Sequence, residues 1–164
     1  MDKIISLWKS HFGPALIAGL AVGIIFLLFS ASPENILLFA SLGASAAILA
    51  HPKYNARANV RVTIISYVLM SVIAIIMRYL ALSFFVSVVL TIFLTAGLLS
   101  WLDLFHPPAI SASLSFLLYS YDILSLLGLL ASIVVLLLLV RLFAYILHPH
   151  LDLSIFHKEL FGKH

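Results

Sequence analysis

Long apolar runs separated by short polar breaks dominate the chain, and each run has the composition of a membrane helix. A helix needs about 20 apolar residues to cross a hydrocarbon core about 30 Å thick, because it rises about 1.5 Å per residue. Four runs are long enough: residues 12–31, 62–82, 84–105 and 123–147. Two apolar segments are shorter, at residues 36–50 and 109–119, and we expect each to form a half-span or a re-entrant helix. The pattern predicts an all-α membrane protein with four full-length transmembrane helices and two short ones.

The amino-acid composition also indicates a membrane protein. The 164 residues are 64% hydrophobic and 9% charged, whereas ordinary soluble domains contain roughly 25% charged residues. Residues 1–164 therefore form a single transmembrane domain, with the lipid bilayer as its solvent. The net charge of +3 fits basic residues in cytoplasmic loops, so we expect no nucleic-acid partner. The chain has no cysteine, which excludes disulfides and thiolate nucleophiles.

The distribution of lysine and arginine predicts the orientation. If both short segments cross the membrane, all but one of the nine basic residues lie on one side, and only Arg78 lies on the other. If the second short segment re-enters instead, the split becomes nearly even. Basic residues favour the cytoplasmic side, so we expect a multi-pass protein of the cell membrane with both termini in the cytoplasm. The tail at residues 151–164 has one apolar helical face and is expected to lie in the membrane interface.

The order of segments suggests a weak three-helix internal repeat, in which a long span, a short helix and a long span occur twice. Many transporters are built from such repeats and bind their substrates at broken helices. Helices this short bury little surface between them, so we also expect a homodimer or a larger homo-oligomer.

The stretch "DLFHPPAISASLSF", at residues 103–116, is the clearest polar break. Proline is favoured in the first turn of a helix, so Pro107 and Pro108 predict a helix that begins there. The positive end of that helix would favour an anion near His106. Ionisable residues at membrane depth often mark a pathway or a proton relay, which makes Asp103 and His106 candidates for one. Ser111, soon after the two prolines, adds a hydroxyl that could bind the same anion. The alternative is that the break is only a turn, with its serines packing between helices.

The first short segment contains small residues in the stretch "SLGASAAILA", including Gly43 and Ser45. Small residues let another helix approach closely, and packing alone would also explain them. His148 and His150 lack a third ligand in the sequence, so we expect no metal and no cofactor.

Three elements in order resemble the HPP family of integral membrane proteins: "GASA" at residues 43–46, Arg-x-Asn-Val at residues 57–60, and "HPPA" at residues 106–109. The resemblance implies four spans and a link to nitrite transport. By position, the resemblance carries over Gly43, Ala44, Ser45, Asn59, His106, Pro107, Pro108 and Ala109.

Our leading hypothesis is a transporter or channel for a small inorganic anion, nitrite by resemblance, and not an enzyme. The expected binding residues are His106, Pro107, Pro108, Ser111, Gly43, Ser45 and Asn59, with His106 and Asp103 carrying a proton or charge. We expect the two short segments to meet inside the bundle, and His106 to be reachable from the cytoplasmic water near His51 or Asn59.

Two alternatives remain. A membrane scaffold or accessory subunit would have a dry, fully packed interior around His106. An intramembrane serine hydrolase would need the Ser45 Oγ within about 3 Å of a His106 nitrogen, so that the imidazole could act as the base.

Overall fold

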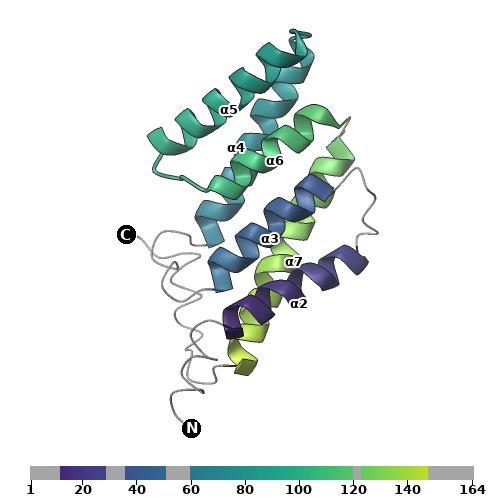
Figure 1. Cartoon of the computed structure of the whole chain (residues 1–164), viewed down its shortest axis with the longest axis vertical. Helices are drawn as coiled ribbons and strands as arrows, with labels where there is room; N and C mark the ends of the chain where they lie inside the picture. Colours follow the sequence, from purple (N-terminus) through teal and green to yellow (C-terminus); the bar gives the residue numbers. More distant parts are fainter. Residues whose placement is uncertain (1–11, 29–35, 51–59, 120–122, 148–164) are drawn as a thin grey trace.

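A computed structural model describes residues 12–28, 36–50, 60–119 and 123–147, and these residues form helices with no strand among them (Figure 1). The helices are α2 (Gly13–Leu28), α3 (Ile36–Ala50), α4 (Val60–Tyr79), α5 (Phe84–Trp101), α6 (Pro107–Leu118) and α7 (Ile123–Leu147). The prediction of an all-helical protein is confirmed for this part of the chain. The tail at residues 151–164 lies outside it.

Three helices in the described part are long and apolar enough to cross a membrane: α4, α5 and the Leu126–Phe143 portion of α7. Helix α2 has 16 residues, which corresponds to about 24 Å at 1.5 Å per residue. It therefore joins α3 and α6 among the shorter apolar helices, and the prediction of four full-length spans is not supported. The predicted repeat is not supported by helix lengths either, because the first helix of the first half is nearly as short as the second.

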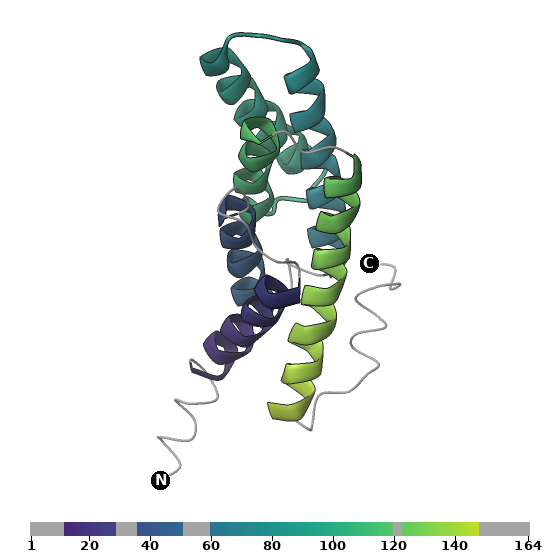
Figure 2. The same ribbon diagram turned by 90° about the vertical axis from the view of Figure 1, so that its right-hand side faces the viewer.

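The helices pack in two groups of three. Helices α4, α5 and α6 contact one another, and so do α2, α3 and α7. The two groups meet where α3 packs on α6 and where α4 packs on α7, and Figures 1 and 2 show them stacked along the long axis. The prediction that the two short segments meet inside the bundle is therefore confirmed.

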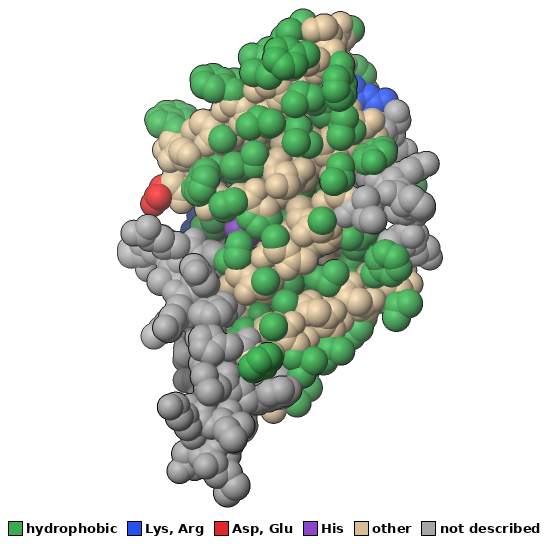
Figure 3. All heavy atoms as spheres, viewed as in Figure 1, with side chains coloured by type: hydrophobic (Ala, Val, Ile, Leu, Met, Phe, Trp, Pro, Cys, Tyr) green, Lys and Arg blue, Asp and Glu red, His purple; other side chains and the backbone are tan. Residues whose placement is uncertain are grey.

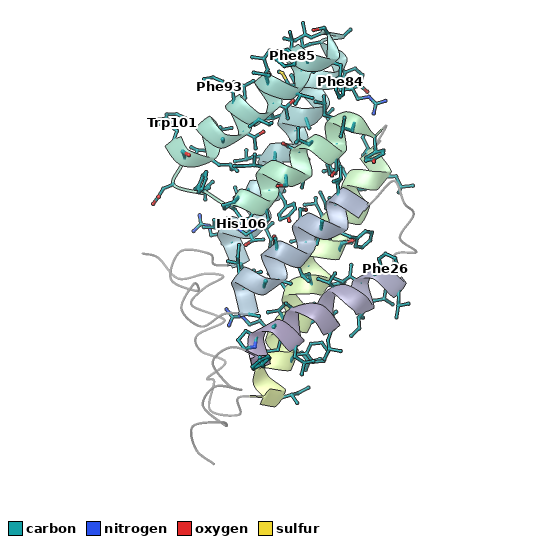
Figure 4. All side chains as sticks on the ribbon, viewed as in Figure 1. Phe26, Phe84, Phe85, Phe93, Trp101 and His106 are labelled. Atoms are coloured by element: carbon teal, nitrogen blue, oxygen red, sulfur yellow. The ribbon has the colours of Figure 1, made fainter. Side chains whose placement is uncertain are left out.

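Apolar side chains are spread over the whole described part of the face in Figure 3, and few charged side chains are seen among them. Helix α5 is an example, because Phe84, Phe85, Phe93 and Trp101 are all exposed along it (Figure 4). On a soluble monomer such a face would mark an interaction site. In a bilayer such a face is not unfavourable, because lipid acyl chains are as apolar as the side chains themselves.

The break between α5 and α6 begins with a specific helix end. Asp103 has a φ of 55°, in the left-handed region that commonly follows the last helical turn. The Leu104 amide donates to the Leu99 carbonyl at 2.8 Å, and the Asp103 amide donates to the Ser100 carbonyl at 3.3 Å. These two bonds form a Schellman motif, which satisfies carbonyls that would otherwise be unpaired. Helix α5 thus ends earlier than predicted, and α6 begins earlier, at the first proline.

Candidate functional site

The His106 side chain lies inside the bundle, where it is 1% exposed. Its backbone is extended, with φ −129° and ψ 93°, as expected for a residue before proline. It is the N-cap residue of α6, but its imidazole makes no capping hydrogen bond. The ring points toward α3 instead, where its Nε2 lies 2.9 Å from the Ser45 Oγ (Figure 4). The break therefore places the imidazole between the two helix groups.

Two further hydroxyls extend this contact. The Tyr67 hydroxyl, from α4, lies 2.8 Å from the Ser45 Oγ and donates to the Ser41 Oγ at 3.2 Å. Ser41 in turn donates to the Leu38 carbonyl at 2.8 Å. We call His106, Ser45, Tyr67 and Ser41 the hydroxyl cluster; all four side chains are buried. Because Ser41 and Ser45 belong to one helix group, and Tyr67 and His106 to the other, the cluster bridges the two.

The number of hydroxyl hydrogens favours one tautomer of His106. The path from His106 through Ser45, Tyr67 and Ser41 to the Leu38 carbonyl contains four hydrogen bonds. Each bond needs one hydrogen, and the three hydroxyls supply only three. All four bonds form together only when the Nε2 of His106 carries the fourth, which leaves Nδ1 as the acceptor of the neutral ring. The Ser41 carbonyl, 3.1 Å from the Ser45 Oγ, competes for the Ser45 hydrogen.

A serine on α4 holds the break itself. The Ser66 Oγ donates to the Leu104 carbonyl at 2.7 Å, and this serine is buried. Leu104 lies two residues before the histidine, between the end of α5 and the start of α6. The bond therefore fixes the non-helical backbone that carries the imidazole, and it satisfies a carbonyl that lies outside any helix.

The start of α6 offers fewer amide donors than a typical helix start. Pro107 and Pro108 have no amide hydrogen, and the Ala109 amide donates to the His106 carbonyl at 3.0 Å. Free backbone N–H groups therefore cannot make this helix end an anion site in the usual way. What remains is the positive end of the macrodipole, together with the side chains of the hydroxyl cluster.

The other predicted site residues are not members of the hydroxyl cluster. Asp103, Pro107 and Ser111 are exposed, whereas Pro108 is buried in the first turn of α6. A Cβ built on Gly43 would lie 3.9 Å from a methyl group of Val22, so this glycine faces α2. Asn59 and His51 lie outside the described residues.

Sequence reasoning missed Tyr67, Ser41 and Ser66. One signal was available for Ser41, which precedes Ser45 by one helical turn and so shares its face. Tyr67 and Ser66 lie in an apolar span whose side chains gave no indication of which face would meet the break. No group of three His, Cys, Asp or Glu side chains occurs among the described residues, and the absence of a metal stays a prediction.

The fold and the site define an all-helical membrane protein in which a His-Pro-Pro break holds a buried histidine against hydroxyls from two other helices. The sequence model described as "HPP, transmembrane region" matches residues 5–152. The chain therefore belongs to the HPP family, as the resemblance indicated. No curated protein and no solved structure matches it.

Proposed function

We propose that this protein is a transporter or channel for a small inorganic anion, with the hydroxyl cluster as its binding site. One observation carries the proposal: an ionisable side chain and three hydroxyls are buried together in a membrane protein, at the contact of two helix groups. Burying polar groups is costly unless they are paired, and ionisable groups inside membrane proteins usually mark a pathway.

The cluster has the chemistry to replace the water around an anion. The His106 Nε2 and the Tyr67 hydroxyl lie 2.9 and 2.8 Å from the Ser45 Oγ, so three groups that can each donate a hydrogen bond lie side by side. An anion that displaced these mutual bonds would accept hydrogens from the same groups. The positive end of α6 would add a favourable field, and a proton on Nδ1 would compensate the charge.

The packing of the two groups suggests how the site would open. The two helix groups have the same pattern of contacts. If α2 is matched with α5, α3 with α6 and α4 with α7, each main helix–helix contact in one group has a counterpart in the other. Transporters with two equivalent halves expose a shared site by rocking one half against the other. The cluster lies between the two helix groups and is buried in this structure, so an anion would enter when the α3–α6 contact opens.

Nitrite is our proposed substrate because of the family relationship alone. The orientation with both termini in the cytoplasm, and the homodimer or larger homo-oligomer, are also proposals. Single cysteines at positions 2 and 163, labelled from either side of the membrane, test the orientation. Labelling of the two positions from opposite sides would overturn it.

Transport is tested by flux into proteoliposomes that contain the purified protein. We expect uptake of at least one of nitrite, nitrate, formate and chloride above the rate in protein-free liposomes. We expect Tyr67→Phe to lower it and Ser132→Ala to leave it unchanged. Ser132 is a matched control, because it is a buried serine on α7 that donates only to the Gly128 carbonyl of its own helix. Parent rates equal to those of empty liposomes for all four anions would overturn the proposal.

A serine hydrolase is the second candidate, because the distance of 2.9 Å between the Ser45 Oγ and the His106 Nε2 meets its geometric requirement. Two features weigh against it. Ser45 lies in the interior of α3, where backbone amides are bonded within the helix and cannot form an oxyanion hole. The Nε2–H tautomer also makes His106 a donor to Ser45, not its base. Labelling of the parent protein, but not Ser45→Ala, by a fluorophosphonate probe would establish the hydrolase.

The scaffold alternative is supported by the burial of His106, since the hydrogen-bond partner of its Nε2, the Ser45 Oγ, lies within the protein. The scaffold alternative predicts no anion flux through the parent protein. It also predicts that substitutions in the hydroxyl cluster leave the assembly of the protein unchanged. The flux experiment above separates it from transport.

A further inference from the structure

Three hydroxyls outside the hydroxyl cluster have no hydrogen-bond partner among the described residues. They belong to Thr91 and Thr95 on α5 and to Ser115 on α6. All three side chains are completely buried. A buried hydroxyl without a partner is unfavourable, and serine and threonine in helices usually avoid this by bonding a carbonyl one turn back, as Ser132 does. The three therefore require a partner that is not part of the described chain.

The two threonines face the same neighbours. They are four residues apart on α5, so they lie on one helical face, which continues the buried stripe of Ser87 and Leu99. The main packing partners of α5 are α4 and α6, while its opposite face carries the exposed aromatic side chains (Figure 4). Thr91 and Thr95 must therefore point into the α4–α5–α6 group.

The connection between α5 and α6 places Ser115 at the same level. The two helices contact each other and are joined by the short break after Trp101. Thr91 and Thr95 lie about 10 and 6 residues before Trp101, and Ser115 lies about 8 residues after Pro107. With Trp101 and Pro107 taken as facing ends of two antiparallel helices, a rise of 1.5 Å per residue puts Ser115 about 3 Å along the axis from each threonine. The three hydroxyls are therefore at a similar height on two helices that contact each other, about 13 Å along α6 from His106.

The charge around these hydroxyls favours a neutral ligand. Neither α5 nor α6 contains a charged residue. The two arginines of α4 lie at or near its ends, and Arg78 donates to the Tyr119 carbonyl. Nothing on these three helices would balance a buried ion at this level.

We propose that Thr91, Thr95 and Ser115 form a binding site for water inside the α4–α5–α6 group. A buried water makes two to four hydrogen bonds, and three hydroxyls that can each donate and accept supply that number. The site is separate from the hydroxyl cluster and holds water whether or not the protein transports an anion.

The sequence allows a selective test, because threonine occurs only at positions 63, 91 and 95. We would label all three with ¹³C and measure magnetisation transfer from water by solid-state NMR in liposomes. Thr63 is the internal control: it is equally buried on α4 but has a partner within the protein. We expect transfer to Thr91 and Thr95 to be several-fold faster than to Thr63. Equal, slow transfer to all three would overturn the proposal.

A variant checks that the three hydroxyls share the same water. Ser115→Ala should slow the transfer to Thr91 and Thr95, whereas Ser132→Ala should not change it. Unchanged transfer in Ser115→Ala would remove Ser115 from the site and contradict the shared water. If the threonine signals respond only to added nitrite, and receive no magnetisation from water in its absence, the ligand is the anion and the water site is wrong.

Discussion

Replacing Tyr67 by phenylalanine tests the hydroxyl cluster most sharply, because it removes one oxygen and keeps the ring. That hydroxyl takes part in hydrogen bonds with Ser45 and Ser41, both on α3, while the tyrosine itself is on α4. A neutral hydrogen bond contributes about 0.5 to 1.5 kcal/mol, and bonds between membrane helices lie toward the low end. Loss of two such bonds should therefore destabilise the protein by about 1 to 3 kcal/mol.

The assay is unfolding of the purified protein in mixed micelles, with Tyr79→Phe as the control. Tyr79 ends the same helix but is 84% exposed, so its hydroxyl should contribute almost nothing. A double-mutant cycle of Tyr67→Phe with Ser45→Ala should give a coupling of at least about 0.5 kcal/mol, since the two hydroxyls touch. Equal stability of Tyr67→Phe and Tyr79→Phe, together with no coupling, would refute the bonded cluster.

The same variant reports on the tautomer. In ¹⁵N-histidine-labelled protein, the His106 signal can be assigned by its loss in His106→Gln. We expect the neutral ring to carry its hydrogen on Nε2 in the parent, and the population of that tautomer to fall in Tyr67→Phe, because the chain of donors is broken. A parent ring with its hydrogen on Nδ1 would contradict the hydrogen count.

Three more predictions use the same unfolding assay. Asp103→Gly should leave stability unchanged or raise it, and Asp103→Val should lower it by about 1 to 2 kcal/mol, because the φ of 55° disfavours a β-branched residue; equal effects would contradict the Schellman end. Gly43→Ala should raise stability by about 0.5 to 1 kcal/mol, since the added Cβ meets only an ordinary contact at 3.9 Å, and a loss would show that the glycine is needed for close packing. Ser66→Ala should cost about 1 to 3 kcal/mol, because the Leu104 carbonyl loses its hydroxyl donor; no change would mean that this bond does not hold the break.

The sequence predicted those parts of the fold that depend on local chemistry. Two prolines after a histidine are enough to place the start of α6 within two residues, because proline fits the first turn and breaks a preceding helix. The length of an apolar run is a weaker guide. Residues 84–105 are mostly apolar, yet α5 ends at Trp101 with 18 residues. Hydropathy records which residues lipid tolerates, and it does not locate the helix end.

The sequence predicted only part of the candidate site. Ser45 and His106 were named from separate segments, and the structure brings them into contact. On α6, Ser111 was named as a binding residue, but it is exposed, whereas Ser113, on the opposite side of the helix, is buried. When nearly every residue of a helix is apolar, periodicity cannot tell the protein-facing side from the lipid-facing side. The packing of the other helices decides which side of such a helix is buried.

The central claim is that the hydroxyl cluster binds the anion that the protein moves. Its most direct test is the initial rate of nitrite uptake into proteoliposomes, at a low nitrite concentration, for the parent and for Ser45→Ala at equal amounts of folded protein. Removing one hydrogen bond to a charged group costs about 1.5 to 3 kcal/mol, which corresponds to a loss of about ten- to a hundredfold. We predict that loss for Ser45→Ala and none for Ser132→Ala. Nitrite uptake at the parent rate by folded Ser45→Ala would contradict the claim.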